Sequence, residues 1–413
     1  MKNSIGEQTR SSASENLPVL TVSELDADAH GAFGHWRKTH PVVAHEGGGY
    51  LVLRHADVLR LAADPRLQAT ETALPQSRGI TQGPLFDIFQ HGMLTANDGT
   101  HERRRSPMSR AVAGQLIAQW RRHVRLSAEA LIDGFYADGQ AEFVSQFADQ
   151  IPIRTLAGLF GVPPEDLPAF TRNVQELGRF FGAGSTEDDI PASTAAAGQL
   201  REYLGNLLRE RRKVPDGDFL TVFQAAADDG EGLSPPEAIF QVIQLILGGT
   251  ESVRAAIVAQ TALLLLHREQ WKAVCADSSL VPAVVTEALR FEPGIAGLVR
   301  ITREAIDLEG FTLPAGQLVI LSTMSAMRDE RVFQRSDIFD IRRPDAPKTH
   351  PVFGWGAHRC LAEALARAEL EESLIALTSR LPRLRLEDIP IFHGHVFIRN
   401  PGRFCVSWPT DDL

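Results

Sequence analysis

The sequence has 413 residues, a formal net charge of −10 and 44% hydrophobic residues, which is typical of a globular protein with an ample core. This acidic balance lacks the basic surplus of a nucleic-acid-binding protein, so we expect no nucleic-acid partner. Three cysteines, Cys275, Cys360 and Cys405, cannot build a disulfide framework, and they predict a reducing, cytoplasmic location.

The first 17 residues are polar and contain no apolar core of a signal peptide. We therefore predict a disordered N-terminal tail over residues 1–17. No apolar run reaches the ~18 residues that span a bilayer, so we expect no membrane anchor. Length alone allows two or three domains.

Residues 18–64 combine a candidate helix with a short pair of strands, where the turn at residues 47–49 precedes a strand over residues 50–53. Residues 70–95 are rich in glycine and proline and are predicted to form a loop. Leu85, Phe86 and Phe89 in this segment either line a ligand pocket or anchor the loop on the core.

A basic helix comes next in the chain. His101 and Arg105 are four residues apart and share one helix face, whereas Arg103 and Arg104 point elsewhere. The latter two arginines either dock an acidic partner or belong to a solvated face.

Residues 126–212 are predicted to be helical with intervening loops, and the prolines at residues 163–164 predict a helix start. Phe180 and Phe181 form an apolar cluster before the segment 182–189, which is predicted to be a mobile loop.

A capping box with proline at the first helical position opens a long helix at Ser234–Glu237. Apolar residues on nearly all sides predict that this helix, ~48 Å from Pro235 to Leu266, is buried. Residues 248–252, Gly-Gly-Thr-Glu-Ser, interrupt it. Two glycines cost ~2 kcal/mol there, and a buried glutamate is costly unless paired, so this interruption indicates a functional site.

Three weaker patterns occupy the C-terminal third. Glu287 and Arg290 lie three residues apart on one predicted helix face. Residues 301–321 alternate around a turn at residues 314–316 and predict a hairpin. Near the C-terminus, residues 396–398 and 404–406 are predicted to be strands around a turn at residues 400–402.

The most informative stretch is Phe353–Ala362. Gly354 and Gly356 permit a tight loop whose backbone can approach a flat ligand. The loop delivers Cys360 to the start of a helix over residues 361–381. A helix N-terminus stabilises a thiolate, which is a strong ligand for iron.

The pattern Phe353-Gly354-x-Gly356-x-His358-x-Cys360-x-Ala362 resembles the haem-binding signature of the cytochrome P450 superfamily, with Ala362 where many members have glycine. The resemblance covers residues 40–410. It implies a mainly α fold with small β-sheets (α+β), in one triangular-prism domain over residues 18–413. Haem b would lie between the long central helix and the helix after the cysteine loop.

The resemblance also implies roles for individual residues. Cys360 would be the iron ligand, and His101, Arg105, Arg300 and His358 would bind the haem propionates. Phe353, Gly354 and Ala362 would complete the cofactor loop. Glu287, Arg290 and Arg343 would form a buried structural cluster.

In the long helix, the interruption resembles the oxygen-binding groove of the family. Gly248 and Gly249 would make room for O₂, and Glu251 matches the family's acid. Ser252 stands where threonine is usual, which leaves proton delivery in place but puts its efficiency in doubt.

The substrate pocket is expected to be apolar, and residues 180–189 stand where the family carries a lid, although ordinary core packing explains Phe180 and Phe181 equally well. The candidate lining residues are Leu85, Phe86, Phe89, Phe180, Phe181, Leu245, Ile295, Leu298, Val396 and Phe397.

The implied function is a haem-thiolate monooxygenase that inserts one oxygen atom from O₂ into a hydrophobic substrate. The sequence contains no flavin or nicotinamide fingerprint, so we expect a separate ferredoxin to supply electrons near Arg103, Arg104 and Arg359. The alternatives are a peroxide-driven or oxygen-independent haem enzyme and a haem-based sensor without turnover. The acid–alcohol pair Glu251–Ser252 disfavours these alternatives.

Overall fold

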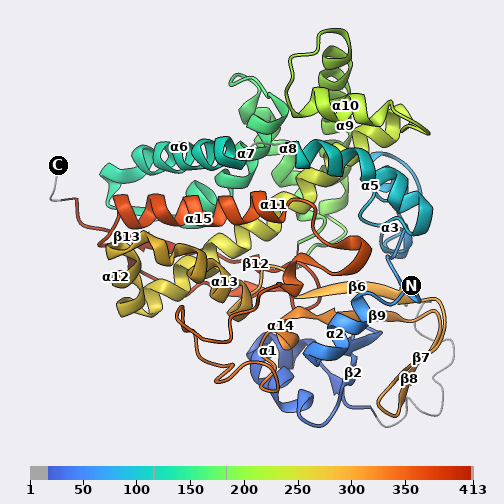
Figure 1. The fold of residues 1–413 in the computed structure, drawn as a ribbon, viewed down its shortest axis with the longest axis vertical. Coiled ribbons are helices and arrows are strands. Elements are labelled where there is room, and N and C mark those ends of the chain that lie inside the picture. Colours follow the sequence, from blue (N-terminus) through green and yellow to red (C-terminus); the bar gives the residue numbers. More distant parts are fainter. Residues whose placement is uncertain (1–16, 115–116, 183, 411–413) are drawn as a thin grey trace.

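The computed structural model describes residues 17–114, 117–182 and 184–410 (Figure 1). The expected disordered tail, residues 1–17, lies outside the described residues except for Leu17. Helices dominate the fold and the sheets are small, which confirms the mainly α class.

Fifteen α-helices occupy most of the described chain: α1 Val22–Arg37, α2 His55–Ala62, α3 Ala73–Ser77, α4 Pro84–His91, α5 Asp98–Ala113, α6 Ile117–Phe135, α7 Gln150–Phe160, α8 Leu167–Arg179, α9 Asp189–Lys213, α10 Phe219–Ala227, α11 Pro235–Leu266, α12 Arg268–Ala276, α13 Val281–Phe291, α14 Thr323–Ala326 and α15 Glu363–Arg380. The shorter turns are 3₁₀ helices, except for the π helix η2: η1 Tyr136–Asp138, η2 Val144–Ala148, η3 Ser278–Leu280, η4 Pro351–Phe353 and η5 Gly356–His358.

The largest sheet has the strand order β1-β2-β3-β9-β6-β4, and its core pairs β6 with β9 in antiparallel register, Arg300 opposite Val319. Smaller sheets pair β10-β13-β5, β11-β12 and β7-β8. The strands are β1 Val19–Leu20, β2 Val42–His45, β3 Tyr50–Val52, β4 Leu67–Gln68, β5 Gln140–Glu142, β6 Gly297–Thr302, β7 Ile306–Leu308, β8 Phe311–Leu313, β9 Leu318–Ser322, β10 Arg385–Leu386, β11 Phe392–His393, β12 Asn400–Pro401 and β13 Cys405–Ser407.

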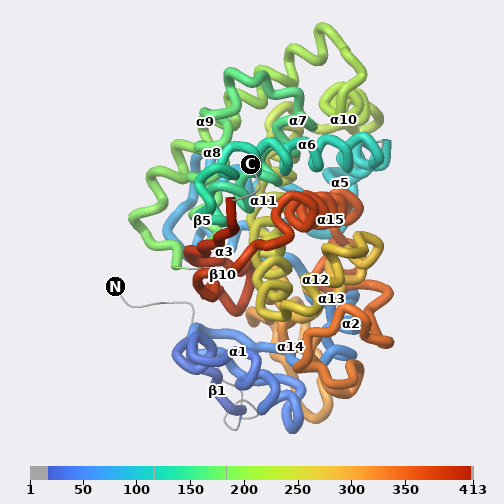
Figure 2. The backbone as a smooth tube through the Cα atoms, turned by 90° about the vertical axis from the view of Figure 1, so that its left-hand side faces the viewer, coloured from blue at the N-terminus to red at the C-terminus, as the bar shows by residue number. Residues whose placement is uncertain are grey.

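Helix α11 runs through the interior, with α15 and α6 along one side of the molecule and the six-stranded sheet at the other end (Figures 1 and 2). Its start is confirmed: the Ser234 hydroxyl accepts from the Glu237 backbone, and the Glu237 carboxylate accepts from the Ser234 backbone. Within the described residues, α11 alone is long and apolar enough to cross a membrane, but 78% of that apolar window is buried inside the protein. It is therefore the core helix that the sequence predicts.

Two predictions about helix starts and loops are wrong. Val162 and Pro163 each precede a proline, which disfavours helical dihedrals, so α8 begins only at Leu167 after a turn. Residues 70–95 are also not one loop, because they contain α3 and α4. Pro84 occupies the first turn of α4, whose buried residues Leu85, Ile88 and Phe89 have the helical spacing that the glycines and prolines obscured.

The C-terminal region also differs from the expectation. Residues 400–401 are strand β12, which pairs with Phe392–His393, and not a turn. Residues 396–397 lie outside the named strands, and Ile398 forms an isolated bridge with Ile295. Proline is tolerated in β12 because a two-stranded sheet consists of edge strands only.

Candidate active site

The cysteine loop has the geometry that its glycines predict. Gly354 and Gly356 have φ values of 73° and 64°, and a Cβ on Gly354 would lie 2.9 Å from the His358 carbonyl oxygen. The Cys360 amide closes the loop by donating to the Phe353 carbonyl at 2.6 Å. Helix α15 then begins at Glu363, which places Cys360 just before its N-terminus.

The thiol of Cys360 lies in a mixed environment. Burial raises the pKa of this thiol, whereas a hydrogen bond from the Ala362 amide and the positive charges of Arg105 and Arg359 act in the opposite direction. A metal ligand must be deprotonated, and these donors favour the thiolate form. A metal ion bound to the sulfur would therefore be supported by these donors against the effect of burial.

Four cationic or donor residues gather beside this loop, and they are the residues for which the family resemblance implies propionate binding. The His101 and His358 rings lie 4.1 Å apart, and Arg105 donates to the carbonyl oxygen of Arg359. Burial, followed by the charges of Arg300, His101 and Arg105, lowers the pKa of His358 to about 3. Positive charges on these residues therefore repel one another.

Arg300 shows most directly that an anion fits here. It stands on β6, burial alone lowers its pKa to about 10, and its guanidinium donates at 2.8 Å to the carbonyl of the adjacent Val299. Among the described residues, no carboxylate forms an ion pair with Arg300. Buried charges need partners, and the two propionates of haem b would supply the missing negative charge.

Residues 248–252 of α11, the Gly-Gly-Thr-Glu-Ser segment, lie on two different faces of a continuous helix. Gly248 is exposed and Ser252 half-buried, and the Ser252 hydroxyl donates to the Gly248 carbonyl at 3.2 Å. Thr250 is buried, and its hydroxyl donates to the Ile246 carbonyl at 3.0 Å. Ser252, not Thr250, therefore lies on the open face with the glycine.

Glu251 points away from this open face. Its Oε2 lies 2.5 Å from Nη2 of Arg254, and a Cβ on Gly178 of α8 would lie 2.7 Å from its Oε1. Burial raises the pKa of Glu251, while Arg254 lowers it. The motif predicted the acid and the alcohol as neighbours but did not reveal that Arg254 and α8 hold the acid.

The structure brings Glu287, Arg290 and Arg343 together. Arg290 donates to both carboxylate oxygens of Glu287, at 2.7 and 2.8 Å, and Nε of Arg343 lies 2.9 Å from the same carboxylate. Arg290 also donates to three backbone carbonyl oxygens, those of Met327, Ser336 and Ile338. The cluster therefore fixes α13 to the segment that leads into the cysteine loop.

Arg103 and Arg104 form an internal ion-pair cluster that the sequence did not predict. Both arginines bind the carboxylate of Glu237, with contacts of 2.5 and 3.0 Å, and so tie α5 to the start of α11. Burial opposes ionisation of Glu237, but hydrogen bonds from Arg103, Ser234 and Arg104 outweigh it and lower the pKa to about 2. Arg359, the third arginine of the predicted docking set, is paired with Glu363, and its side chain is 36% exposed, against 30% for Arg103 and 11% for Arg104.

The predicted pocket residues divide into two sets. Phe89, Phe180 and Phe181 form an aromatic cluster with centroids 5.1–6.0 Å apart, in the same apolar core as Leu85 and Leu245. Within this first set, Phe181 is only partly buried, as is Phe86 of α4.

The second set of predicted pocket residues lies in and just before strand β6 and around residues 396–397. Ile295 and Leu298 are partly buried, Val396 packs against another core cluster, and Phe397 is 38% exposed. The Ala296 amide binds the Phe397 carbonyl at 2.6 Å, which holds the segments around residues 296 and 397 together. Gly294 lets the segment before β6 approach α11, because a Cβ there would lie 2.5 Å from the Ser252 carbonyl oxygen.

Arg78, at the end of α3, binds the segment that is predicted to be a lid. The sequence did not reveal this contact. Arg78 donates to the Phe180 carbonyl at 3.4 Å, the Ser185 hydroxyl at 3.0 Å and the Thr186 carbonyl at 2.7 Å. Its guanidinium also stacks 4.6 Å from the Phe180 ring. No local pattern marks this role, since its partners lie more than a hundred residues away.

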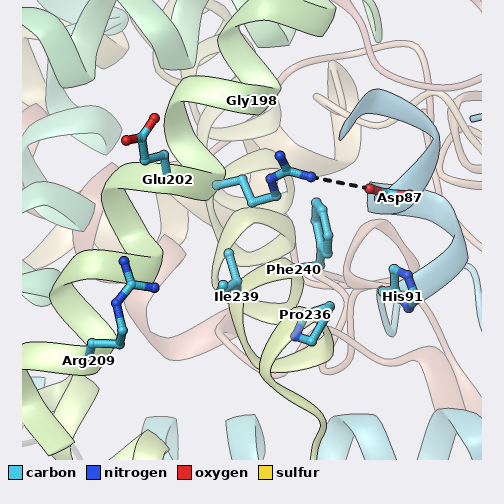
Figure 3. A pocket seen from close by; sticks show the side chains of 9 residues that line it. Asp87, His91, Gly198, Glu202, Arg209, Pro236, Ile239 and Phe240 are labelled. Atoms are coloured by element: carbon cyan, nitrogen blue, oxygen red, sulfur yellow. Dashed lines mark ion pairs between the residues drawn. The ribbon is translucent and has the colours of Figure 1, made fainter. Parts of the chain in front are cut away.

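A separate surface pocket of about 490 Å³ lies between α4, α9 and α11 (Figure 3). Pro236, Ile239 and Phe240 lie on its α11 side, and Arg201 and Asp87 form an ion pair at 3.7 Å across it. It contains none of the predicted site residues.

Comparisons with known proteins agree with this geometry. The cytochrome P450 family model matches residues 192–390. A plant-inducible cytochrome P450, pinF1, of Rhizobium radiobacter is 36% identical over 394 residues, covering 95% of this chain and 93% of that protein. Nocardicin C N-oxygenase of Nocardia uniformis subsp. tsuyamanensis is 34% identical, covering 87% and 89%. The crystal structure of CalO2 superimposes with a TM-score of 0.86 at 25% identity, covering 94% and 98%.

The chain belongs to the cytochrome P450 family. It is a monooxygenase of that family, with haem b as its cofactor. When bound, the haem iron supplies the redox chemistry that activates O₂. The cysteine loop and the cationic residues beside it have the chemistry to hold this cofactor.

Arg300→Leu is expected to weaken haem retention, because it removes the buried cation that would pair with a propionate. The variant should contain less haem after purification and lose it faster to a haem scavenger. The matched control is Arg303→Leu, three residues along the chain, where the arginine is 57% exposed and pairs with Asp98. Equal haem content and loss rate in both variants would remove Arg300 from the propionate site.

Proposed function

We propose that this monooxygenase inserts one oxygen atom into a hydrophobic, ring-containing substrate. The observation that carries the proposal is the open face of α11, where Gly248 and Ser252 stand in the same helix as Leu245, a neighbour of the aromatic cluster. Aromatic side chains favour flat apolar ligands through offset or edge contacts. Phe181 and Phe397, both partly exposed, are the side chains we assign to substrate contact.

Electrons are proposed to come from a separate ferredoxin-type protein. The 413 residues contain no flavin or nicotinamide fingerprint. Arg359 lies on the Cys360 loop, is partly exposed, and offers a positive contact to an acidic donor. We also propose a cytoplasmic location, because all three cysteines are free thiols.

The test of this function is a reconstituted reaction. Apolar compounds are first screened for the shift to high-spin iron in the absorption spectrum of the haem-loaded enzyme, which reports binding in the pocket. A binding compound should then be oxygenated with NADH, a surrogate ferredoxin and its reductase. Product formation with peroxide alone would favour the peroxide-driven enzyme, and binding without product would favour the sensor.

Glu251 and Ser252 are proposed to deliver protons during turnover, Ser252 by holding a water with its hydroxyl and Glu251 as a general acid. The half-buried Ser252 hydroxyl, which lies on the open face, supports the first role.

Ser252→Ala is expected to uncouple the enzyme, because the water loses its hydroxyl partner. NADH consumption should continue while peroxide rises and product falls. Thr250→Ala is the matched control, since its hydroxyl is buried against the Ile246 carbonyl. Peroxide and product per NADH are measured in both. Lost coupling in Thr250→Ala with full coupling in Ser252→Ala would contradict the assignment.

A further inference from the structure

The π helix η2 places Asp149 next to the middle of α11, where it contacts Arg254. In η2 the Asp149 amide donates to the Val144 carbonyl, five residues earlier, at 2.8 Å. Such a turn inserts one residue into the helical repeat and rotates the residues after it, and it is common at functional sites. The Glu142 carboxylate holds the start of η2 by accepting the Ser145 amide at 2.7 Å.

Arg254 then joins Asp149 to Glu251. Its Nη1 lies 3.3 Å from Oδ1 of Asp149, and its Nη2 lies 2.5 Å from Oε2 of Glu251. Nη2 also donates to the Asn400 side-chain oxygen of β12 at 2.9 Å. The guanidinium group of Arg254 therefore forms ion pairs with two carboxylates.

If both carboxylates are ionised, Asp149, Glu251 and Arg254 together carry one excess negative charge in a largely buried position. The side chains of Asp149 and Glu251 are 15% and 9% exposed. Burial raises the pKa of each, Arg254 lowers both, and Asp149 raises that of Glu251 while Glu142 raises that of Asp149. From α8, Gln175 offers Asp149 a neutral donor at 3.5 Å. A single proton on the pair relieves the excess charge.

Asp149 is the more exposed of the two acids, and Glu251 is the one next to Ser252 along α11. Asp149 comes after exposed residues of η2, Ser145 and Gln146, whereas Glu251 stands beside Ser252 in α11. Arg254 reaches both carboxylates with the two nitrogens of one planar group. The Asp149 side chain, 15% exposed against 9% for Glu251, is therefore the more accessible of the two to solvent.

We propose that Asp149 supplies protons to Glu251, with which it shares one proton beneath Arg254. This inference rests on the proposed role of Glu251. A proton from solvent binds the Asp149 carboxylate, crosses a hydrogen-bonded water to the Glu251 carboxylate, and leaves towards the Ser252 hydroxyl, while Arg254 stays charged throughout. Asp149 acts through Glu251 and is therefore a positioning residue.

The test is Asp149→Asn in the haem-loaded enzyme, beside Glu251→Gln and Asp149→Glu. Product per NADH should fall roughly tenfold in Asp149→Asn, less than the ~10²–10⁴ that a complete general acid contributes. Asp149→Glu should restore much of it. The pH at which coupling is half-maximal should fall in Asp149→Asn, because Glu251 loses the negative neighbour that raises its pKa.

An infrared measurement gives a readout that does not depend on turnover. The resting wild-type enzyme should show the C=O band of a protonated carboxyl group at neutral pH, and both Asp149→Asn and Glu251→Gln should lack it. Glu369 is also buried, and burial raises its pKa to about 8, so Glu369→Gln identifies its separate band. Asp133→Asn, an exposed acid paired with Arg380, is the control that should change nothing.

The outcomes separate the two proposals. Full coupling in Glu251→Gln would refute the role of Glu251 itself. Lost coupling in Glu251→Gln, with coupling and infrared band unchanged in Asp149→Asn, would refute the role of Asp149 alone. Should the asparagine variant not fold, Asp149→Ser is measured in its place, and an equal loss in Asp133→Asn would also refute the inference.

Discussion

Cys360→Ser is expected to abolish monooxygenase activity and the red-shifted Soret band of the carbon monoxide complex of the reduced enzyme. A serine hydroxyl is not ionised at neutral pH and does not donate electron density to iron as a thiolate does. The loop itself should persist, because it is closed by the Cys360 backbone amide and by two glycines with positive φ.

The measurement is the difference spectrum of the reduced enzyme with and without carbon monoxide, together with haem content. Cys275→Ser is the matched control, because this cysteine is a partly buried free thiol on α12, outside the cysteine loop. Survival of the red-shifted band in Cys360→Ser would show that another residue binds the iron.

The largest loss of stability is expected for Glu287→Gln. The change leaves Arg290 and Arg343 buried without their shared carboxylate, and breaking a buried ion pair from one side costs about 3–5 kcal/mol in the free energy of unfolding. That is a large part of the roughly 5–15 kcal/mol that stabilises a typical domain.

Urea unfolding followed by circular dichroism measures this effect as a lower midpoint. Glu269→Gln is a close control, because Glu269 and Lys272 have the same three-residue helical spacing as Glu287 and Arg290 but are 86% and 65% exposed. Exposed pairs contribute about 0–1 kcal/mol. Similar midpoints for the two variants would mean that the buried cluster does not stabilise the fold.

Features encoded by neighbouring residues were predictable from the sequence. The capping box of α11 joins Ser234 to Glu237, and the turn around Cys360 depends on Gly354 and Gly356, so a few adjacent residues specify each. The same holds for the placement of the Ser252 and Thr250 hydroxyls on different faces, which results from the 3.6-residue repeat.

Contacts between distant residues were not predictable in this way. The partner of Arg103 and Arg104 is more than 130 residues further along, and Asp149 is 105 residues from Arg254. The same arginine pattern is compatible with a docking surface or an internal ion pair, because only tertiary packing decides which acid is near. Helix α4 was missed for a local reason, since its glycine and proline neighbours masked a short apolar face.

The contacts of Arg78 have a consequence for how the segment between α8 and α9 tolerates substitution. Two of its three polar contacts with the lid are to peptide oxygens, which remain whatever side chain occupies the position. The side chains at residues 180 and 186 can therefore vary while these two hydrogen bonds persist. The position of the segment between α8 and α9 is in this way largely independent of the side chains that it presents.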